Sequence, residues 1–293
     1  MNDQAQRLRH FAQNLSDTFP PDDAAAARQP DVTSRCTSLA VTSGKGGVGK
    51  STISVSLAIA LAKLKKSVCV VDADIGLANI HLLLGLAPRR NLSHVVNEEC
   101  LPEEIIATGP AGIHVLPGAS GIERLANIDP LRLNLLQRKL ARLEQGYDFL
   151  VIDTGAGIGK TTTEFAAKAD MAVVVVTPEP ASLADAYAMI KVLYEKKVAR
   201  LSVLVNRAIT DAEGKETFDK LNTLVVKFLK RPLELIGIAP LDNQATVLAK
   251  RQKLSIMENP RSLFAVRIGN CARKLSGVRM LKNESFFARL LNV

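Results

Sequence analysis

The chain has 293 residues, of which 47% are hydrophobic and 23% charged, as expected of a globular protein with a sizeable core and not of a disordered or fibrous one. No apolar run is long enough to span a bilayer and no basic, apolar leader is present, so we expect a cytoplasmic protein. The four cysteines lie far apart, which disfavours a metal or iron–sulfur site made of local ligands. The net charge of +9 predicts an anionic partner, either nucleic acid or a phospholipid surface.

A short helix followed by a linker is predicted at the start of the chain. Apolar residues recur at i, i+3, i+4 and i+7 from Leu8, which indicates an amphipathic helix within residues 1–15. Residues 16–34 are rich in prolines, acids and small side chains without an apolar period, and we expect a flexible linker there. A linker of this length is unneeded for local packing, so we favour docking of the helix to a partner.

Strand-like apolar runs then alternate with helical segments from residue 35 to residue 276. This alternation predicts α/β architecture, with one doubly wound, mainly parallel sheet covered by helices on both faces. The strands are predicted at 39–42, 68–71, 113–116, 149–152, 172–176, 201–205 and 235–238. The helices are predicted at 52–64, 131–144, 161–168, 181–196, 215–229 and 260–275.

A glycine-rich loop joins the first predicted strand to the first predicted helix. The spacing of Gly44 and Gly49-Lys50-Ser51 fits the phosphate-binding loop GxxxxGK[ST], in which backbone amides surround phosphates. In that loop Lys50 would reach the β- and γ-phosphates, and the Ser51 hydroxyl would bind Mg²⁺. The predicted nucleotide-binding residues of the loop are Gly44, Gly46, Gly47, Val48, Gly49, Lys50, Ser51 and Thr52.

The same glycines also fit the dinucleotide fingerprint GxGxxG, with Asp72 and Asp74 at about the distance of a ribose-binding carboxylate. A dehydrogenase loop has no use for Lys50 and Ser51, and it does not require the carboxylate of Asp153 at the end of a later strand. We therefore favour a nucleoside triphosphate with Mg²⁺ over a dinucleotide.

Polar residues follow four of the predicted strands, and ligands of parallel sheets collect at such strand ends. Asp153 follows four apolar residues. In phosphate-loop NTPases, an aspartate in this position at the end of a strand holds Mg²⁺ through a water molecule. A single aspartate at a strand end is more often a turn former or a helix cap, so the prediction depends on the combination. The other strand-end residues are Asp72, Asp74, Asn206, Arg207, Pro240 and Asp242.

The loop sequence KGGVGKS, with Lys45 directly after Gly44, and the segment VDADIGLAN resemble two motifs of the MinD/ParA family of dimerising ATPases. The resemblance covers residues 38–260 and implies ATP and Mg²⁺ as ligands. It implies that Lys45 crosses a dimer interface to the partner's phosphates, as an arginine finger does, while Asp74 positions the attacking water and Asp72 helps hold the Mg²⁺ shell.

The family resemblance thus divides the candidate residues into three groups. The catalytic group is Lys45, Lys50 and Asp74. The Mg²⁺ group is Ser51, Asp72 and Asp153. The adenine-binding positions, which favour ATP over GTP, are Asn206, Arg207, Pro240 and Asp242.

Within this family, the N-terminal segment DQAQRLR resembles the DQAxxLR segment of the flagellar-number regulators, the FlhG branch. That resemblance implies that the segment docks on a signal-recognition-type GTPase, FlhF, and stimulates its hydrolysis. Gln4 would be offered to the partner's active site, and Arg9 would support the contact. It also implies flagellar switch or C-ring components and a transcriptional activator of flagellar genes as partners. The Ala- and Pro-rich linker supports no inference about the branch.

The last predicted element is an amphipathic helix within residues 277–293. Phe286, Phe287, Leu290 and Leu291 fall on one side of it and Arg289 on the other, which suits a helix lying on a membrane surface. The alternative is a terminal helix packed on the domain. The membrane-bound and the packed helix are compatible if the helix is docked in the monomer and released in the dimer. Two released copies would then bind the membrane with higher avidity.

These features together predict an ATP-driven monomer/dimer switch with slow, Mg²⁺-dependent ATP hydrolysis. As an ATP-bound homodimer it would lie on the inner face of the cell membrane and regulate flagellar number and placement, with DNA not expected as a primary partner. The alternatives are a ParA-like DNA-partitioning ATPase, a MinD-like division-site ATPase, and an adaptor that binds nucleotide without meaningful turnover.

Overall fold

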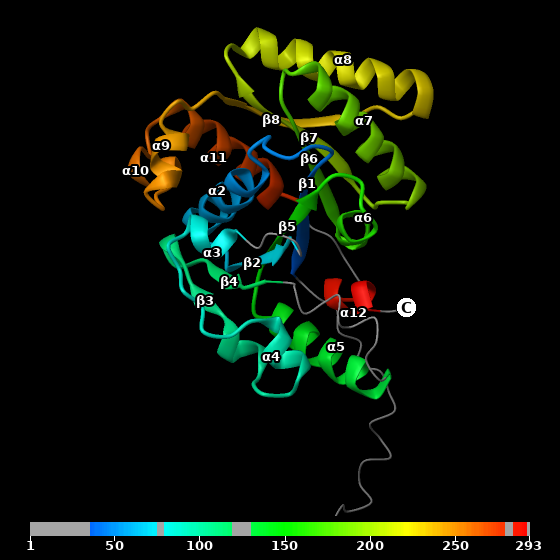
Figure 1. The fold of residues 1–293 in the computed structure, drawn as a ribbon. Coiled ribbons are helices and arrows are strands. Elements are labelled where there is room, and N and C mark those ends of the chain that lie inside the picture. The colour runs from blue at the N-terminus through cyan, green and yellow to red at the C-terminus, as the bar shows by residue number, and fades with distance from the viewer. Residues whose placement is uncertain (1–35, 75–78, 119–129, 279–283, 292–293) are drawn as a thin grey trace, which may run out of the picture. The chain divides into compact units, whose positions relative to one another are not determined.

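The computed structural model describes residues 36–74, 79–118, 130–278 and 284–291 (Figure 1). The helix and linker predicted over residues 1–34, with Gln4 and Arg9, lie outside these ranges.

One sheet of eight strands forms the centre of the domain, in the order β3-β4-β2-β5-β1-β6-β7-β8. Every neighbouring pair is parallel except β3 with β4, so the predicted doubly wound, mainly parallel sheet is confirmed. The strands are β1 (Thr37–Ser43), β2 (Val68–Ala73), β3 (Ala107–Thr108), β4 (His114–Leu116), β5 (Phe149–Ala156), β6 (Met171–Val176), β7 (Leu201–Ala208) and β8 (Glu234–Pro240).

Each face of the sheet is covered by its own hydrophobic core. Along β6, Ala172, Val174 and Val176 belong to one core and Met171 and Val173 to the other, because successive side chains of a strand point to opposite faces. Both faces are buried, which explains why the strands read as continuous apolar runs.

Figure 1 shows α2 and α11 on one side of the sheet and α5, α6 and α12 on the other. The core that contains Met171 and Val173 is built with α2 (Lys50–Lys63), α3 (Ile80–Leu83), α10 (Ser255–Glu258) and α11 (Leu263–Ser276). The other core is built with α4 (Leu92–Val96), α5 (Pro130–Glu144), α6 (Lys160–Lys168), α7 (Pro180–Glu195), α8 (Asp211–Leu229) and α12 (Phe286–Leu291). The remaining helix, α9 (Ala245–Lys250), follows β8.

The elements that the sequence did not predict are short, and one predicted helix begins earlier than expected because of a local cap. The two-residue strand β3 and the helices α3, α4, α9 and α10 are too short to show a period. The helix α8 begins four residues earlier than predicted, because Thr210 accepts a hydrogen bond from the Glu213 amide at 3.1 Å. The Glu213 carboxylate in turn accepts from the Ile209 amide at 2.6 Å, which extends the cap.

The C-terminal helix is packed on the domain in this structure, as expected of the docked state predicted for the monomer. The predicted membrane-facing side chains of Phe286, Phe287 and Leu291 are 0%, 1% and 6% exposed, because α12 packs them between α5 and α6. Leu290 also packs against this core. The amphipathic pattern is real, but its apolar side faces the domain. None of the described helices is long and apolar enough to cross a membrane.

Candidate functional site

The glycine-rich loop lies at the carboxyl end of β1, directly before α2. Gly47 and Gly49 have φ values of 80° and 89°, a left-handed conformation that glycine adopts without steric cost. Gly44 is required for another reason, because a Cβ atom there would lie 2.0 Å from the backbone oxygen of Asp185 in α7. The loop therefore packs closely on α7 and presents its backbone at the first turn of α2, a favourable site for phosphate.

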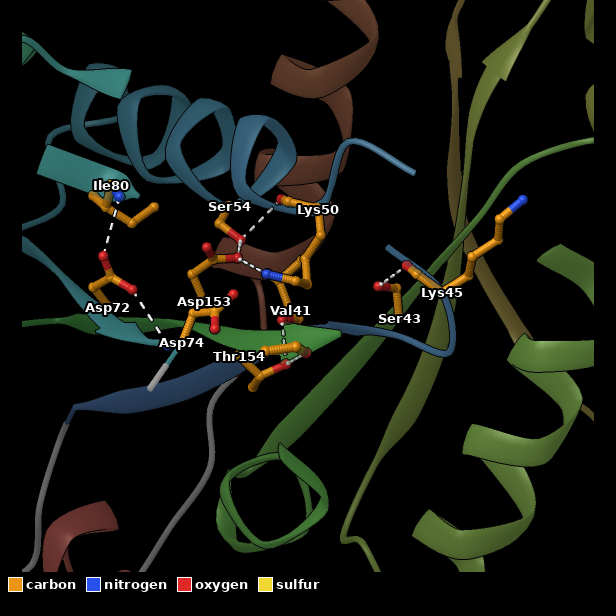
Figure 2. A network of polar contacts seen from close by, with 11 residues as sticks. Val41, Ser43, Lys45, Lys50, Ser54, Asp72, Asp74, Ile80, Asp153 and Thr154 are labelled. Atoms are coloured by element: carbon orange, nitrogen blue, oxygen red, sulfur yellow. Dashed lines mark hydrogen bonds and ion pairs between the residues drawn. The ribbon is translucent and has the colours of Figure 1, made fainter. Parts of the chain in front are cut away.

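Lys50 is buried and bound to Asp153 of β5 (Figure 2). The Lys50 Nζ atom lies 2.9 Å from Asp153 Oδ1, and the side chains are 8% and 2% exposed. The Ser54 hydroxyl donates to the same oxygen at 2.7 Å. Ser54 was not predicted, although it lies four residues after Lys50 and so on the same face of α2.

Asp72 and Asp153 are neighbours on adjacent strands, in register between β2 and β5. Asp72 accepts hydrogen bonds from the amides of Ile80 at 3.0 Å and Asp74 at 3.3 Å. Burial raises the pKa of Asp72 to about 6, and the nearby charge of Asp153 adds to the rise. Two buried carboxylates side by side are an arrangement that a divalent cation would stabilise.

Asp74 follows the end of β2 and faces the β5 side of the site. A Cβ atom built on Gly155 would lie 3.6 Å from the Asp74 Oδ1 atom and 3.0 Å from the Thr162 hydroxyl of α6. The glycine at position 155 thus leaves room for the Asp74 carboxylate beside the strand that carries Asp153.

Lys45 points away from this cluster. Figure 2 shows its side chain directed away from Lys50, Asp72 and Asp153. Its Nζ atom lies 2.8 Å from Glu179 Oε2, just before α7, and the two side chains are 38% and 58% exposed. The hydrogen bond and charge of Lys45 lower the pKa of Glu179. Glu179 was not predicted as a site residue, because nothing in the sequence links it to the loop.

The predicted adenine positions lie at the same edge of the sheet but do not converge on one point. Asn206, at the end of β7, donates to the Val48 carbonyl at 2.8 Å and so is bound to the phosphate loop itself. Pro240 and Asp242 instead line a cavity of about 830 Å³ beyond β8. Arg207 is exposed, with a left-handed φ of 61°.

The donors available for Mg²⁺ are oxygen atoms, as this hard cation prefers. They comprise the carboxylates of Asp72 and Asp153 and the hydroxyl of Ser51, which is half-buried with Thr52 in the first turn of α2. Within the described ranges, no three His, Cys, Asp or Glu side chains are grouped closely enough to hold a metal alone. This set fits Mg²⁺, which usually binds through one or two carboxylates together with water and phosphate oxygens.

The family profile named ParA, described as an NUBPL iron-transfer P-loop NTPase, matches residues 36–276. The chain belongs to the ParA/MinD family of P-loop NTPases. The iron-transfer part of that description has no counterpart in the grouping of the cysteines, which are buried and spread over separate parts of the fold: Cys36, Cys69, Cys100 and Cys271.

Curated relatives place this ParA/MinD protein near flagellar regulators, and the predicted resemblance to the FlhG branch is confirmed. The antiactivator FleN of Pseudomonas aeruginosa is 37% identical over 259 residues, which are 86% of this chain and 92% of FleN. The flagellum site-determining protein YlxH of Helicobacter pylori is 36% identical over 263 residues, which are 86% of this chain and 89% of YlxH.

A solved structure shares the fold. The MinC:MinD cell division protein complex of Aquifex aeolicus matches with a TM-score of 0.67 and 28% identity, over 84% of this chain and 97% of the matched chain. The predicted roles of individual residues stay predictions, and they enter the proposal below.

Proposed function

We propose that this chain is an ATP-driven switch between monomer and dimer, with slow, Mg²⁺-dependent hydrolysis. The observation that carries the proposal is the orientation of Lys45, which belongs to the phosphate loop and yet turns its charge away from the loop toward the surface. A lysine so placed would serve the phosphates of a second subunit better than those of its own.

Lys50 would change partners when nucleotide binds. In the described structure its ammonium neutralises Asp153, and the phosphates of ATP would compete for that charge. Asp153 would then be free, with Asp72 and Ser51, to hold the Mg²⁺ shell. When bound, Mg²⁺ neutralises the charge that develops on the phosphates. Asp74 would orient the attacking water, and Ser54 would keep the Asp153 carboxylate in position.

Lys45 would exchange Glu179 for the partner's phosphates on dimerisation. The pair with Glu179 is exposed, so water and salt screen it and it contributes little to stability. Glu179 would therefore hold Lys45 in a defined place in the monomer without preventing its transfer. A phosphate in a desolvated interface would bind the lysine more strongly.

Regulation of flagellar number and placement is the biological role that we infer. FleN and YlxH, whose names refer to antiactivation and to flagellum site determination, support this role. The segment within 1–15 would stimulate an FlhF-type GTPase through Gln4 and Arg9, and C-ring components and a transcriptional activator would be further partners.

Peripheral attachment to the inner face of the cell membrane would use α12. Because Phe286 and Phe287 are buried, the helix would have to detach from its position between α5 and α6 before it could enter a bilayer. Release on dimerisation would give one complex two such helices, and binding through both would raise membrane affinity by avidity.

A role at the division site is the second candidate, because the septum site-determining protein MinD of Synechocystis is 32% identical over 248 residues. Both candidates share the ATP switch, and a test of the switch comes first. We expect Asp74→Ala to sediment as a dimer with Mg-ATP, at twice the 31.6 kDa of the chain, and as a monomer with Mg-ADP. A monomer under both conditions would overturn the proposal.

A further inference from the structure

A second buried ionic cluster holds α12 at the amino edge of the sheet, opposite the phosphate loop. Arg289 of α12 donates from Nη1 to Asp170 Oδ1 at 2.7 Å and from Nη2 to the Ser38 hydroxyl at 3.2 Å. Asp170 directly precedes β6, and Ser38 lies at the start of β1. Gly44 lies six positions after Ser38, just past the end of β1, and a strand rises about 3.3 Å per residue, so this cluster is about 20 Å from the phosphate loop.

Beside Arg289 the surface is hollowed into a cavity of about 400 Å³, within the range of small-ligand sites. Four cations from three separate elements line it: Lys168 at the end of α6, Lys196 and Lys197 after α7, and Arg289 of α12. Glu164 is the one acidic residue among the lining residues.

Two of these cations are already paired. Lys196 forms an ion pair with Glu164, and Arg289 forms one with Asp170. Across the described part of the chain, no ion pair is formed by Lys168 or Lys197. The Nε atom of Arg289 is buried without a hydrogen-bond partner among the described residues.

Lysines often end helices because they complement the negative end of the helix dipole, and α6 and α7 both end here. That explanation accounts for only part of the charge. Each helix end is equivalent to roughly half a negative charge. Lys196 is paired with Glu164 and Arg289 with Asp170, and the charges of Glu144 and Glu284 also act on Arg289. The two unpaired lysines, Lys168 and Lys197, set against two helix ends of roughly half a negative charge each, leave about one positive charge uncompensated on their side of the cavity. One positive charge in a small cavity matches a phosphodiester, which carries one negative charge.

We propose that the cavity formed by Lys168, Lys196, Lys197 and Arg289 is a binding site for a phosphodiester, the headgroup phosphate of an anionic phospholipid. This inference rests on the membrane association proposed above and assigns its headgroup site. The bound phosphate would share Arg289 with Asp170 and so weaken the contact that holds α12. The headgroup would thus meet the protein while α12 is still docked, before Phe286 and Phe287 are released.

A single fluorophore can report this site, because the chain contains no tryptophan. Ala199 is exposed and lines the cavity, so Ala199→Trp places an indole at its rim. The full chain carrying Ala199→Trp is titrated with short-chain phosphatidylglycerol, short-chain phosphatidylcholine and inorganic phosphate, with saturating Mg-ADP to fill the phosphate loop. Vesicles of phosphatidylglycerol and of phosphatidylcholine form a second arm, sedimented with Mg-ATP.

Two matched double variants separate a site from general electrostatics. Lys168→Gln with Lys197→Gln removes the two unpaired cations of the cavity. Lys215→Gln with Lys230→Gln removes the same charge from exposed positions in and after α8. Neither control residue lines the cavity.

We expect a saturable fluorescence change with phosphatidylglycerol that phosphatidylcholine does not produce. The cavity variant should weaken this binding at least about tenfold, because it loses charge-assisted hydrogen bonds, and the control variant should not. No saturable change, or equal weakening in both double variants, would overturn the site. Saturable binding of phosphatidylglycerol and phosphate without sedimentation on vesicles would support the phosphate site and contradict the proposed membrane association.

Discussion

The two edges of the sheet each hold a buried carboxylate paired with a cation, but they are assembled differently. At the carboxyl edge, Asp153 binds Lys50 and Ser54, which are both on α2. At the amino edge, Asp170 binds Ser38 and Arg289, which are 132 and 119 residues away from it. The first cluster joins a central strand to a 14-residue helix, whereas the second holds a six-residue terminal helix that a competing ligand could release.

Lys45→Ala gives the largest expected effect at the carboxyl edge. We expect ATP hydrolysis to fall by about a thousandfold, since a cation supplied in trans contributes that much to phosphoryl transfer, and ATP-dependent dimers to disappear while ATP binding persists. Turnover and sedimentation measure the two effects. Glu179→Gln, which removes only the partner of Lys45 in the monomer, should still dimerise. ATP-dependent dimers of Lys45→Ala would remove Lys45 from the interface.

Asp74→Ala should lower ATP hydrolysis by about a hundredfold or more, the size of the contribution of a group that handles the attacking water. ATP binding should persist because Asp74 follows β2 and belongs neither to the phosphate loop nor to the first turn of α2, which would hold the phosphates. Phosphate release under saturating ATP measures the loss, and filter binding measures the affinity. Normal turnover in this variant would refute the role of Asp74.

Arg289→Met tests the amino edge. The variant keeps the apolar stem but removes the cation paired with the buried Asp170, which still accepts hydrogen bonds from Ser38. Breaking a fully buried pair costs about 3–5 kcal/mol, and because Arg289 is 24% exposed we expect the free energy of unfolding to fall by about 2 kcal/mol. Urea denaturation measures the change. Arg142→Met, at an exposed position of α5, is the control, and equal stability of the two variants would show that Arg289 does not hold α12.

The smallest expected effect lies outside both edges. A peptide of residues 1–15 should accelerate GTP hydrolysis by an FlhF-type GTPase, and Gln4→Ala should abolish the acceleration. The same peptide with Gln6→Ala is the control, because position 6 is variable in the DQAxxLR segment. Loss of the effect with both peptides, or no effect of the parent peptide, would remove the main support for this partner.

The carboxyl edge was largely predictable because its residues follow strands in short motifs. The loop glycines, Lys50 and the strand-end aspartates all come from local patterns, and the structure places them together at one edge. The contact of Lys45 with Glu179 spans 134 residues, so the sequence contains no signal for it.

The amino edge was not predictable, because its cluster joins three distant segments. The amphipathic period of α12 shows that one side of the helix is apolar. Such a side can be buried equally well in a bilayer or in a protein core. In the structure, the buried Glu144 fixes α12 on the domain, because its carboxylate accepts hydrogen bonds from the amides of Phe286 at 3.0 Å and Phe287 at 3.3 Å. A carboxylate near the end of α5 gives no sign that it caps a helix more than 140 residues away.

The central claim is that ATP makes the protein a membrane-binding dimer, and one sedimentation experiment tests it directly. The protein is spun with phosphatidylglycerol vesicles and, separately, with DNA, each with Mg-ATP and with Mg-ADP. We expect the protein to sediment with vesicles in ATP and to remain in solution in ADP, with no nucleotide-dependent binding to DNA. Salt-sensitive, ATP-dependent sedimentation with DNA and none with vesicles would contradict the account and favour a DNA-partitioning role.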